Sequence, residues 1–287
     1  MQILRELSVG QNLIVLRKLG IIAGGGVIPS QICSACQESG RPHFVIGIQG
    51  SVDRNSLATS PHKMFRLGAI GGIITEFKKN GIEEVVMVGS ITRPSWQDLR
   101  PDFRGLKMLP KLLGSGQGDG DILKIAISEL EREGFKVVGV EKVLPSLLTP
   151  LGKIGAHLPN TSSKKDISFG INVAKTIGDL DIGQAVVVQQ GVVLGVEAAE
   201  GTKSLLCRCA GLSKKGEKGV LIKLKKSHQD PRADLPTIGP HTVLQLNQSG
   251  ISGVALEAGS SLIVQREEVI RLADDFGIFV LGINLDN

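Results

Sequence analysis

The sequence contains no tyrosine and only one tryptophan among its 287 residues, and aromatic residues make up 3% of it. Proteins that bind single-stranded nucleic acid usually stack the bases on aromatic side chains. The net charge of +5 and the isoelectric point of about 9.0 are also modest for a nucleic-acid-binding protein. We therefore expect no nucleic acid as a partner. The small positive excess favours a phosphorylated metabolite or an anionic membrane surface instead.

Long apolar runs are also lacking. No stretch approaches the ~20 consecutive apolar residues that a membrane-spanning helix requires, and residues 1–16 do not have the hydrophobic core of a signal peptide. Cysteine is scarce: Cys33 and Cys36 fall in an expected helix, whereas Cys207 and Cys209 are too close together for good zinc geometry. We expect a cytoplasmic protein whose thiols are structural rather than metal-binding.

The apolar residues that are present indicate an α/β fold with a Rossmann-like N-terminal domain. Short runs rich in valine and isoleucine alternate with longer amphipathic segments. The expected elements of this domain, residues 18–140, are strands at 18–23, 43–48, 84–88 and 135–140 and helices from 28, at 70–79 and at 121–133. This β-α-β alternation is typical of a doubly wound parallel sheet.

The second half has a different pattern. Residues 141–163 contain Pro145, Pro150 and Pro159 and few helix formers, so we interpret them as a linker. Residues 164–287 mix hairpins with helices, which indicates an α+β catalytic domain. Its expected elements are helices at 166–177, 203–210 and 267–276 and strands at 185–188, 192–196, 220–224, 253–256, 261–264 and 279–283, with a hairpin turn at Gln190-Gly191.

Two loops of the first half follow expected strands. Gly24-Gly25-Gly26 lies between a strand and a helix, where backbone amides can approach a phosphate. The run is not a G-x-G-x-x-G, and no acidic residue for a ribose follows the second strand, which disfavours a nicotinamide dinucleotide. A tight turn without a ligand is the alternative. Ser90 and Arg93 follow the third strand, in the position where open α/β sheets bind ligands.

The segment from Lys223 to Gly239 is the most informative in the second half. It carries three lysines, one arginine, one histidine and two carboxylates, and Pro231 and Pro236 prevent regular structure. Such a loop suits a site that binds a phosphate and a cation together. A solvated surface turn is the alternative. Asp234, with Glu197 and Glu257 at the ends of other strands, would make a cluster for a hard cation, although the sequence does not say whether they converge.

Together these segments resemble the UDP-2,3-diacylglucosamine pyrophosphatases of lipid A biosynthesis, the two-domain type that is unrelated to calcineurin-like metallophosphoesterases. The resemblance extends over about residues 18 to 283, and the last of its stretches is the longest. The matching stretches are Leu19–Gly26, Arg93-Pro94, Arg104–Lys107, Asp179–Gln184, Val196–Thr202 and Gln229–Gly239.

The resemblance implies hydrolysis of the diphosphate of a lipid-linked UDP-sugar to 2,3-diacylglucosamine 1-phosphate and UMP. It also implies dependence on Mg²⁺, a lipid bound between the two domains, and water attack on the sugar-side phosphate. The essential aspartate of the family corresponds to Asp234, which we expect to bind Mg²⁺ or to orient the water. The residues expected to contact substrate are Ala23, Gly24, Gly25, Ser90, Arg93, Lys107, Gln190, Thr202, Lys223, Lys225, Arg232 and Thr237.

Some positions depart from the family pattern. Lys203 stands where an acidic residue is common, and Ser227-His228 replaces a common Lys-Pro. Residues 1–17 lie outside the resemblance. A nicotinamide-dependent oxidoreductase and a non-enzymatic sugar-nucleotide-binding module are the alternative functions. For a lipid substrate we also expect an apolar cleft between the domains and peripheral contact with the cytoplasmic face of the inner membrane. The sequence leaves open whether the protein forms a homodimer.

Overall fold

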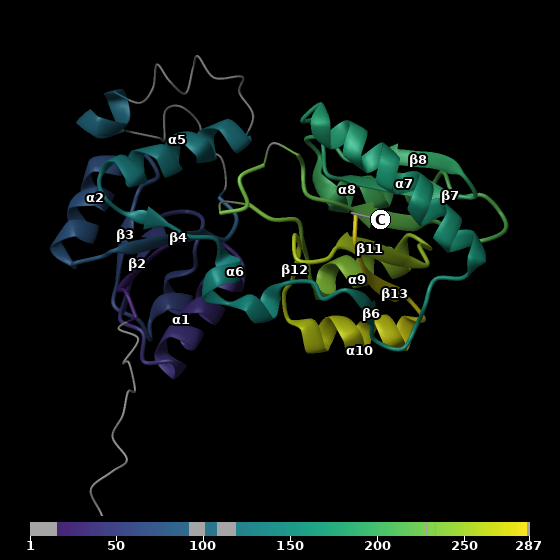
Figure 1. The fold of residues 1–287 in the computed structure, drawn as a ribbon, viewed down its shortest axis with the longest axis horizontal. Helices are drawn as coiled ribbons and strands as arrows, with labels where there is room; N and C mark the ends of the chain where they lie inside the picture. Colours follow the sequence, from purple (N-terminus) through teal and green to yellow (C-terminus); the bar gives the residue numbers. More distant parts are fainter. Residues whose placement is uncertain (1–15, 92–100, 108–118, 228, 233, 286–287) are drawn as a thin grey trace, which may run out of the picture.

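A computed structural model of the protein describes residues 16–91, 101–107, 119–227, 229–232 and 234–285. Two domains lie side by side, the N-terminal one in purple and blue and the C-terminal one in green and yellow (Figure 1). This arrangement confirms the expected α/β class, with a parallel sheet in the first domain and a mixed sheet in the second. Within the described residues, none of the helices has the length and apolar character needed to cross a bilayer.

The N-terminal domain contains a parallel sheet with the strand order β3-β2-β1-β4-β5. This is the order of one half of the Rossmann fold and its continuation beyond the switch point between β1 and β4. The elements are β1 (Leu19–Ala23), α1 (Ile28–Glu38), β2 (His43–Ile48), η1 (Arg54–Leu57), β3 (His62–Phe65), α2 (Ile70–Lys79), β4 (Glu84–Val88), α5 (Asp119–Arg132), β5 (Lys136–Val137) and α6 (Val140–Val143).

Helices cover both faces of this sheet, which is why its central strands are apolar over most of their length. On one face, Ile32 and Cys36 of α1 pack in a buried cluster with residues of β1 and β4. On the other face, α2 and α5 enclose a second cluster, in which Phe77 meets Phe135 edge to face with their ring centroids 5.8 Å apart. Strand β3 was not predicted, because its sequence His-Lys-Met-Phe has little β character.

The C-terminal domain is built on a six-stranded mixed sheet with the order β6-β13-β11-β9-β7-β8. After η2 (Pro145–Leu147), which packs with the N-terminal domain, the elements are β6 (Gly152–Ile154), α7 (Thr161–Asp179), β7 (Ala185–Gln189), β8 (Val192–Val196), α8 (Gly201–Ala210), β9 (Val220–Lys223), β10 (Thr237–Ile238), α9 (Pro240–Gln248), β11 (Gly253–Glu257), β12 (Leu262–Ile263), α10 (Arg266–Phe276) and β13 (Phe279–Ile283).

The strands of this sheet have two directions. β9, β11 and β13 pair in parallel, whereas β7 is antiparallel to both β9 and β8. β8 therefore runs in the same direction as β9, β11 and β13, so the carboxyl ends of these four strands meet at one edge of the sheet. Ligands of open α/β sheets bind outside this kind of edge.

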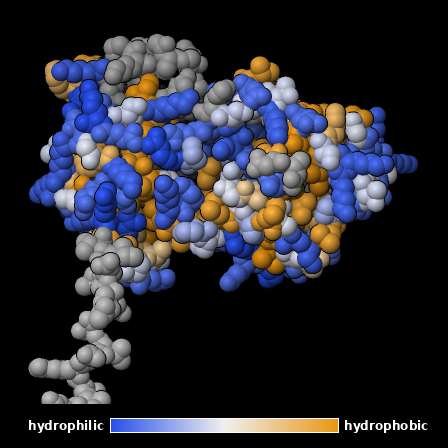
Figure 2. Space-filling view, viewed as in Figure 1, coloured by the Kyte–Doolittle hydropathy of each residue, from blue (hydrophilic) through white to orange (hydrophobic). Residues whose placement is uncertain are grey.

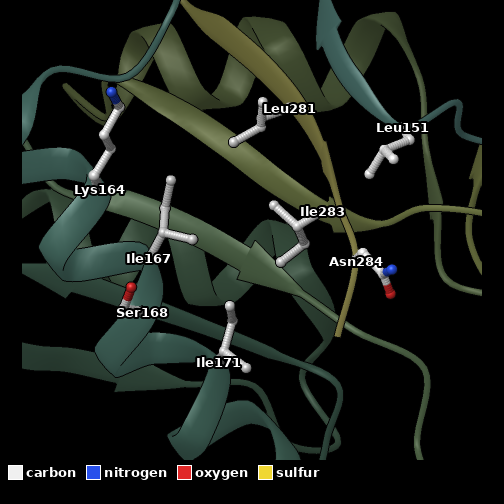
Figure 3. Close-up of a pocket in the computed structure, with 8 residues that line it drawn as sticks. All are labelled: Leu151, Lys164, Ile167, Ser168, Ile171, Leu281, Ile283 and Asn284. Carbon is white, nitrogen blue, oxygen red and sulfur yellow. The ribbon is translucent and has the colours of Figure 1, made fainter. Parts of the chain in front are cut away.

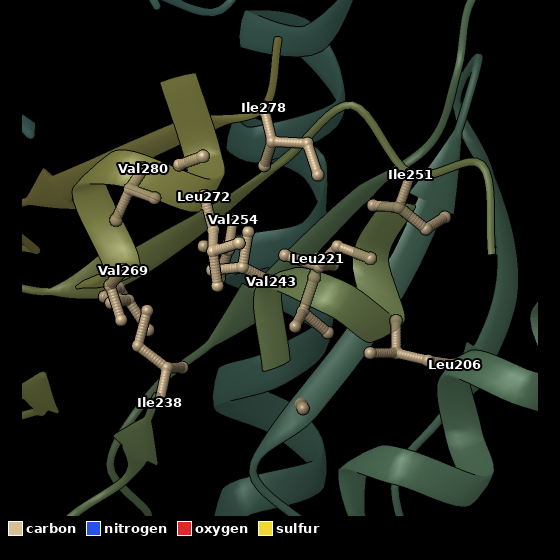
Figure 4. Close-up of a cluster of buried hydrophobic side chains, with 14 of the residues drawn as sticks. Leu206, Leu221, Ile238, Val243, Ile251, Val254, Val269, Leu272, Ile278 and Val280 are labelled. Carbon is tan, nitrogen blue, oxygen red and sulfur yellow. The ribbon is translucent and has the colours of Figure 1, made fainter. Parts of the chain in front are cut away.

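The two faces of the sheet are covered unequally. One face packs against α8, α9 and α10 around Leu206, Leu221, Val243, Val254 and Leu272 (Figure 4). The opposite face packs against α7, which contacts β7 and β9 most closely. Side chains of one strand alternate between the two faces, so the position of a residue along its strand decides which helices it meets.

The segment expected as a linker, residues 141–163, contains regular structure. Most of α6 lies in it, and β6 joins the C-terminal sheet by antiparallel pairing with β13. At the junction of the domains, the hydroxyl groups of Ser261 and Thr149 are hydrogen-bonded over 2.8 Å, and both residues are buried. The predicted strand at 135–140 is shorter than expected, because α6 begins at Val140.

Candidate functional site

The carboxyl edge of the C-terminal sheet gathers several of the predicted site residues. Glu197 follows β8, Lys223 ends β9, and Glu257 ends β11. The segment that carries Asp234 leaves the sheet directly after Lys223. The predicted residues therefore do share one edge of the fold, and the pairing of the strands places them there.

The predicted metal ligands are separated because the side chains of each strand alternate between the two faces of the sheet. Lys223 is two residues after Leu221, which faces α8 and α9, whereas Glu257 is two residues after Ala255, which faces α7. Glu257 and Lys223 therefore project from opposite faces of the sheet. Within the part of the chain that the structure describes, no group of three or more His, Cys, Asp or Glu side chains is placed to hold a metal ion. The predicted cluster of Asp234, Glu197 and Glu257 does not form, and these residues do not fit an all-protein magnesium site.

Lys223, Thr202 and Glu197 form a hydrogen-bonded chain, here called the lysine relay. Lys223 is 6% exposed, and its ammonium donates to Thr202 Oγ1 over 2.9 Å and to the Thr237 carbonyl over 3.3 Å. Thr202 Oγ1 in turn donates to Glu197 Oε1 over 2.5 Å. Glu197 is 5% exposed, and its other oxygen accepts the Gln184 amide over 3.3 Å. The structure thus joins three predicted site residues, Thr202, Lys223 and Glu197, with the backbone of a fourth, Thr237.

Burial shifts the pKa of this lysine. Desolvation lowers the pKa of Lys223 below its ordinary value, because a buried ammonium loses its hydration. The negative charges of Glu197 and Asp234 act in the opposite direction and offset part of this effect.

The segment from Leu224 to Pro236, here called the site loop, is anchored on the C-terminal domain at its start. Lys226 Nζ forms an ion pair with Asp181 over 2.8 Å, and the Ser227 hydroxyl donates to Asp179. The Lys225 amide donates to Glu257 Oε2 over 3.1 Å. Glu257 thus holds the backbone of the loop, which gives this carboxylate a role in shaping the site.

The second part of the site loop reaches the N-terminal domain. Arg232 forms ion pairs with Asp230 over 2.7 Å and with Glu131 of α5 over 2.5 Å. Leu235 is buried in the same cluster as Leu19 and Ile21 of β1. Arg232, for which substrate contact stays a prediction, bridges the two domains in the structure. Figure 1 shows the light-green segment extending from the C-terminal domain towards the N-terminal one.

Asp234 lies between these two attachments. Its side chain is exposed, and it accepts a hydrogen bond from the amide of Gln229. Because Arg232 and Leu235 on either side are held against the N-terminal domain, Asp234 is presented at the boundary between the domains. Sequence reasoning did not single out Gln229 or Glu131. Gln229 belongs to a matched stretch and could have been noticed, whereas nothing local marks Glu131.

At the switch point of the N-terminal sheet, the predicted glycines form hydrogen bonds with the backbone of the neighbouring segment. The Gly24 amide donates to the Val88 carbonyl over 2.8 Å, the Gly25 amide donates to Ser90 over 2.7 Å, and the Ser90 amide donates back to Gly25 over 3.0 Å. These bonds occupy the two glycine amides that were expected to approach a phosphate. Ala23 is fully buried at the end of β1.

Three other predicted contacts lie apart from the Lys223 cluster or outside the described residues. Gln190 occupies the hairpin turn at φ 51°, and Asp166 accepts its amide over 2.9 Å. β7 runs away from the carboxyl edge, so Gln190 lies at the opposite edge of the sheet from Lys223. Lys107 is exposed, with its Nζ 4.4 Å from the centroid of the Phe103 ring. Arg93 lies outside the described residues.

An open apolar groove lies on the α7 face of the C-terminal domain. Its volume is about 390 Å³, and Ile167, Ile171, Leu281 and Ile283 form its apolar walls, with Lys164 at the rim (Figure 3). Apolar surface is visible on the near face of this domain in Figure 2. Lys223 projects from the other face of the sheet, so the sheet separates this groove from the polar cluster.

Comparisons with known proteins agree with the resemblance in the sequence. The model of the LpxI N-terminal domain matches residues 18–147, and the model of the LpxI C-terminal domain matches residues 150–281. The boundary between them falls inside the segment expected as a linker. A Caulobacter vibrioides protein named UDP-2,3-diacylglucosamine pyrophosphatase LpxI is 40% identical in an alignment 276 residues long, which covers 94% of this chain and 98% of that protein.

Solved structures resemble the chain only weakly. The UDP-glucose 4-epimerase of Thermus thermophilus in complex with NAD has a TM-score of 0.32 and 13% identity, and the match covers 93% of this chain and 85% of that chain. The biotin carboxylase domain of a Hydrogenobacter thermophilus 2-oxoglutarate carboxylase has a TM-score of 0.24 and 13% identity, over 62% of this chain and 36% of that chain. Neither carries an argument about function. The two domain models and the extended identity show that the chain belongs to the LpxI family.

Proposed function

We propose that this protein hydrolyses the diphosphate of UDP-2,3-diacylglucosamine to UMP and 2,3-diacylglucosamine 1-phosphate. Family membership and the name of the 40% identical relative support the substrate. The observation that carries the proposal is the position of Asp234, at the domain boundary and on the loop that begins directly after the buried Lys223. An anion-binding cation beside a carboxylate is what hydrolysis of a diphosphate needs.

The proposed role of Asp234 is to orient the attacking water. A diphosphate repels nucleophiles because it is negatively charged, so a positioned carboxylate must aim the water while cations neutralise the phosphates. Asp234 is exposed and can meet a substrate, and the Gln229 amide fixes its orientation. Attack at the sugar-side phosphorus is part of this proposal, and product analysis after reaction in ¹⁸O-labelled water tests it.

The proposal includes Mg²⁺, which would neutralise charge on the diphosphate. The described carboxylates do not form a site for this ion in advance. Mg²⁺ in proteins is commonly held by one or two carboxylates together with substrate phosphates, so we propose that it arrives with the substrate. If UMP release in EDTA equals that in Mg²⁺, this part of the proposal fails.

The substitution Asp234→Asn tests the proposed function. It keeps the size and the hydrogen-bonding shape of the side chain but removes the charge, so turnover should fall on the order of 10²-fold or more with little change in KM. The assay is UMP release from UDP-2,3-diacylglucosamine with Mg²⁺. Asp275→Asn on the exposed side of α10 is the matched control. Near wild-type turnover of Asp234→Asn would remove this residue from the mechanism.

We propose that the protein acts in the cytoplasm and that it meets its lipid substrate at the inner membrane by peripheral contact. The positive net charge of +5 supports attraction to an anionic leaflet. Co-sedimentation with vesicles that contain 30% or 0% anionic lipid, at about 0.1 M salt, tests this attraction. Equal binding to the two kinds of vesicle would contradict it.

A further inference from the structure

A lysine ending a central strand with only 6% of its surface exposed requires an explanation. Lysine is almost never fully buried unless its charge is compensated, because its ammonium loses hydration. The strand pairing fixes Lys223 in place, since Ala185 of β7 and Leu256 of β11 are its neighbours on either side. An apolar residue would fill this position without the desolvation cost, so we expect the charge itself to have a function.

The hydroxyl of Thr202 connects this ammonium to a buried carboxylate. Thr202 Oγ1 accepts from Lys223 Nζ over 2.9 Å and donates to Glu197 Oε1 over 2.5 Å. A hydroxyl has one donor and two acceptor lone pairs, so it can serve both partners at once. The direction of these bonds requires Lys223 to be the donor and Glu197 to be the acceptor. The Thr237 carbonyl holds the ammonium from a second side, over 3.3 Å.

The elements that supply these groups are different parts of the fold. Glu197 follows β8, Thr202 lies in the first turn of α8, and Thr237 begins β10 immediately after the site loop. The ammonium of Lys223, which lies just before the site loop, is thus held by Thr237 just after this loop and by Thr202 of α8. This arrangement gives a fixed positive charge at the carboxyl edge, next to the proposed water-orienting carboxylate.

We infer that Lys223 is a catalytic residue that contacts the substrate diphosphate, and that Thr202 and Glu197 are positioning residues that hold its ammonium. This inference rests on the proposed hydrolysis. The ammonium stabilises the negative charge that develops on the phosphates as the bond between them breaks. Because its counter-charge is built into the protein, it needs no reorganisation during the reaction. Glu197 in this assignment serves Lys223 and is not a metal ligand.

Kinetics of Lys223→Met test the contact. Removal of one fixed group that stabilises transition-state charge costs about 10²–10³-fold in kcat, so we expect a loss of this size. Lys175→Met, on the exposed surface of α7, is the control for loss of a positive charge. The melting temperature and circular dichroism of each variant show whether it is folded. A folded Lys223→Met enzyme with a kcat within twofold of the wild type would overturn the inference.

Variants of Thr202 test the positioning role and do not alter any charge. Thr202→Val removes the hydroxyl with little change in shape and should lower kcat by about tenfold, which is the cost of a lost hydrogen bond to a charged group. Thr202→Ser keeps the hydroxyl and should restore kcat to within about threefold of the wild type. A structural role in packing predicts the reverse order, because valine retains the methyl group and serine does not. Equal kcat values for the wild type and Thr202→Val would exclude the relay.

A binding experiment separates this inference from the proposed function. If the wild-type protein does not release UMP, the proposed hydrolysis fails, but the contact of Lys223 with a diphosphate can still be measured. Titration calorimetry with UDP should then show an affinity for Lys223→Met that is at least tenfold weaker than for the wild type and Lys175→Met. Equal affinities would show that the ammonium does not meet the phosphates.

Discussion

Substitution of Gly24 by alanine tests whether the glycine-rich turn closes the N-terminal sheet or binds a phosphate. An added Cβ would lie 2.4 Å from the Ser90 carbonyl oxygen and 2.8 Å from that of Gly89. Both contacts are with backbone atoms, so no side chain can rotate away. The Ser90 carbonyl is also the acceptor of the Gly25 amide over 2.7 Å. Relief of the clash therefore strains or breaks the bridge between β1 and β4.

The expected cost combines two effects. Overpacking of a close-packed position costs about 1–3 kcal/mol, and loss of a buried backbone hydrogen bond costs about 1 kcal/mol more. The lower flexibility of alanine in the unfolded chain offsets about 0.4–1 kcal/mol of this destabilisation. A net loss of about 2 kcal/mol corresponds to a fall in melting temperature of about 4–8 °C for a domain of this size.

Differential scanning calorimetry measures this change, with Gly211→Ala as the control. Gly211 ends α8 at φ −74°, and the nearest atom to an added Cβ is 3.9 Å away, so this variant should lose no stability. If the Gly24 amide instead binds a phosphate, Gly24→Ala should raise KM and leave the melting temperature unchanged. That result would refute the closed turn described above.

The structure supports three further predictions. Gln190→Asn should leave KM unchanged, because this turn lies about 17 Å along the strands from Lys223. It should not lower the melting temperature, because asparagine before Gly191 suits the left-handed turn. A raised KM would show that this turn does contact the substrate. The hydrogen bond from Arg232 lowers the pKa of Asp230. This carboxylate therefore stabilises the fold above its unfolded pKa of about 3.9, and the contribution is lost as pH falls through the lower folded-state pKa. Calorimetry from pH 6 to pH 2 should show a smaller loss of stability on acidification for Asp230→Asn than for the wild type, and equal losses would contradict this prediction. Burial raises the pKa of Cys36 to about 11, so iodoacetamide should modify exposed Cys207 and spare Cys36 in the native protein at pH 7, as peptide mass spectrometry can show.

Much of the N-terminal fold follows from the pattern of the sequence. Strands 43–48 and 84–88 and the helix 70–79 were predicted with their observed bounds, because each is a run of one periodicity with turn residues at its ends. β6 could not be predicted. Its three residues carry no local strand signal, and it is a strand only because β13 pairs with it.

The hairpin turn shows the limit of motif reasoning about function. Gln190-Gly191 was correctly placed as a turn, because a polar residue before glycine between two valine-rich runs indicates one. Its assignment to the substrate site was not supported by the structure. Turns at the two ends of a sheet look alike in sequence, and the edge to which each belongs is decided by strand direction, which long-range pairing sets.

The same reasoning explains why the predicted carboxylates did not converge while the lysine relay formed. Position at the end of a strand is readable from sequence, so Glu197, Lys223 and Glu257 could be placed at one edge. The face of the sheet from which a side chain projects depends on whether its residue lies an odd or an even number of positions from a buried residue of the same strand. The helices that cover this buried residue then decide what the side chain meets. Lys223 and Glu197 face α8, where Thr202 joins them, whereas Glu257 faces α7 and binds the backbone of the site loop. A cluster proposed from strand ends alone therefore needs a second condition, which is that its side chains project from the same face of the sheet. In this chain that condition selects a buried cation with its counter-ion over a set of metal ligands.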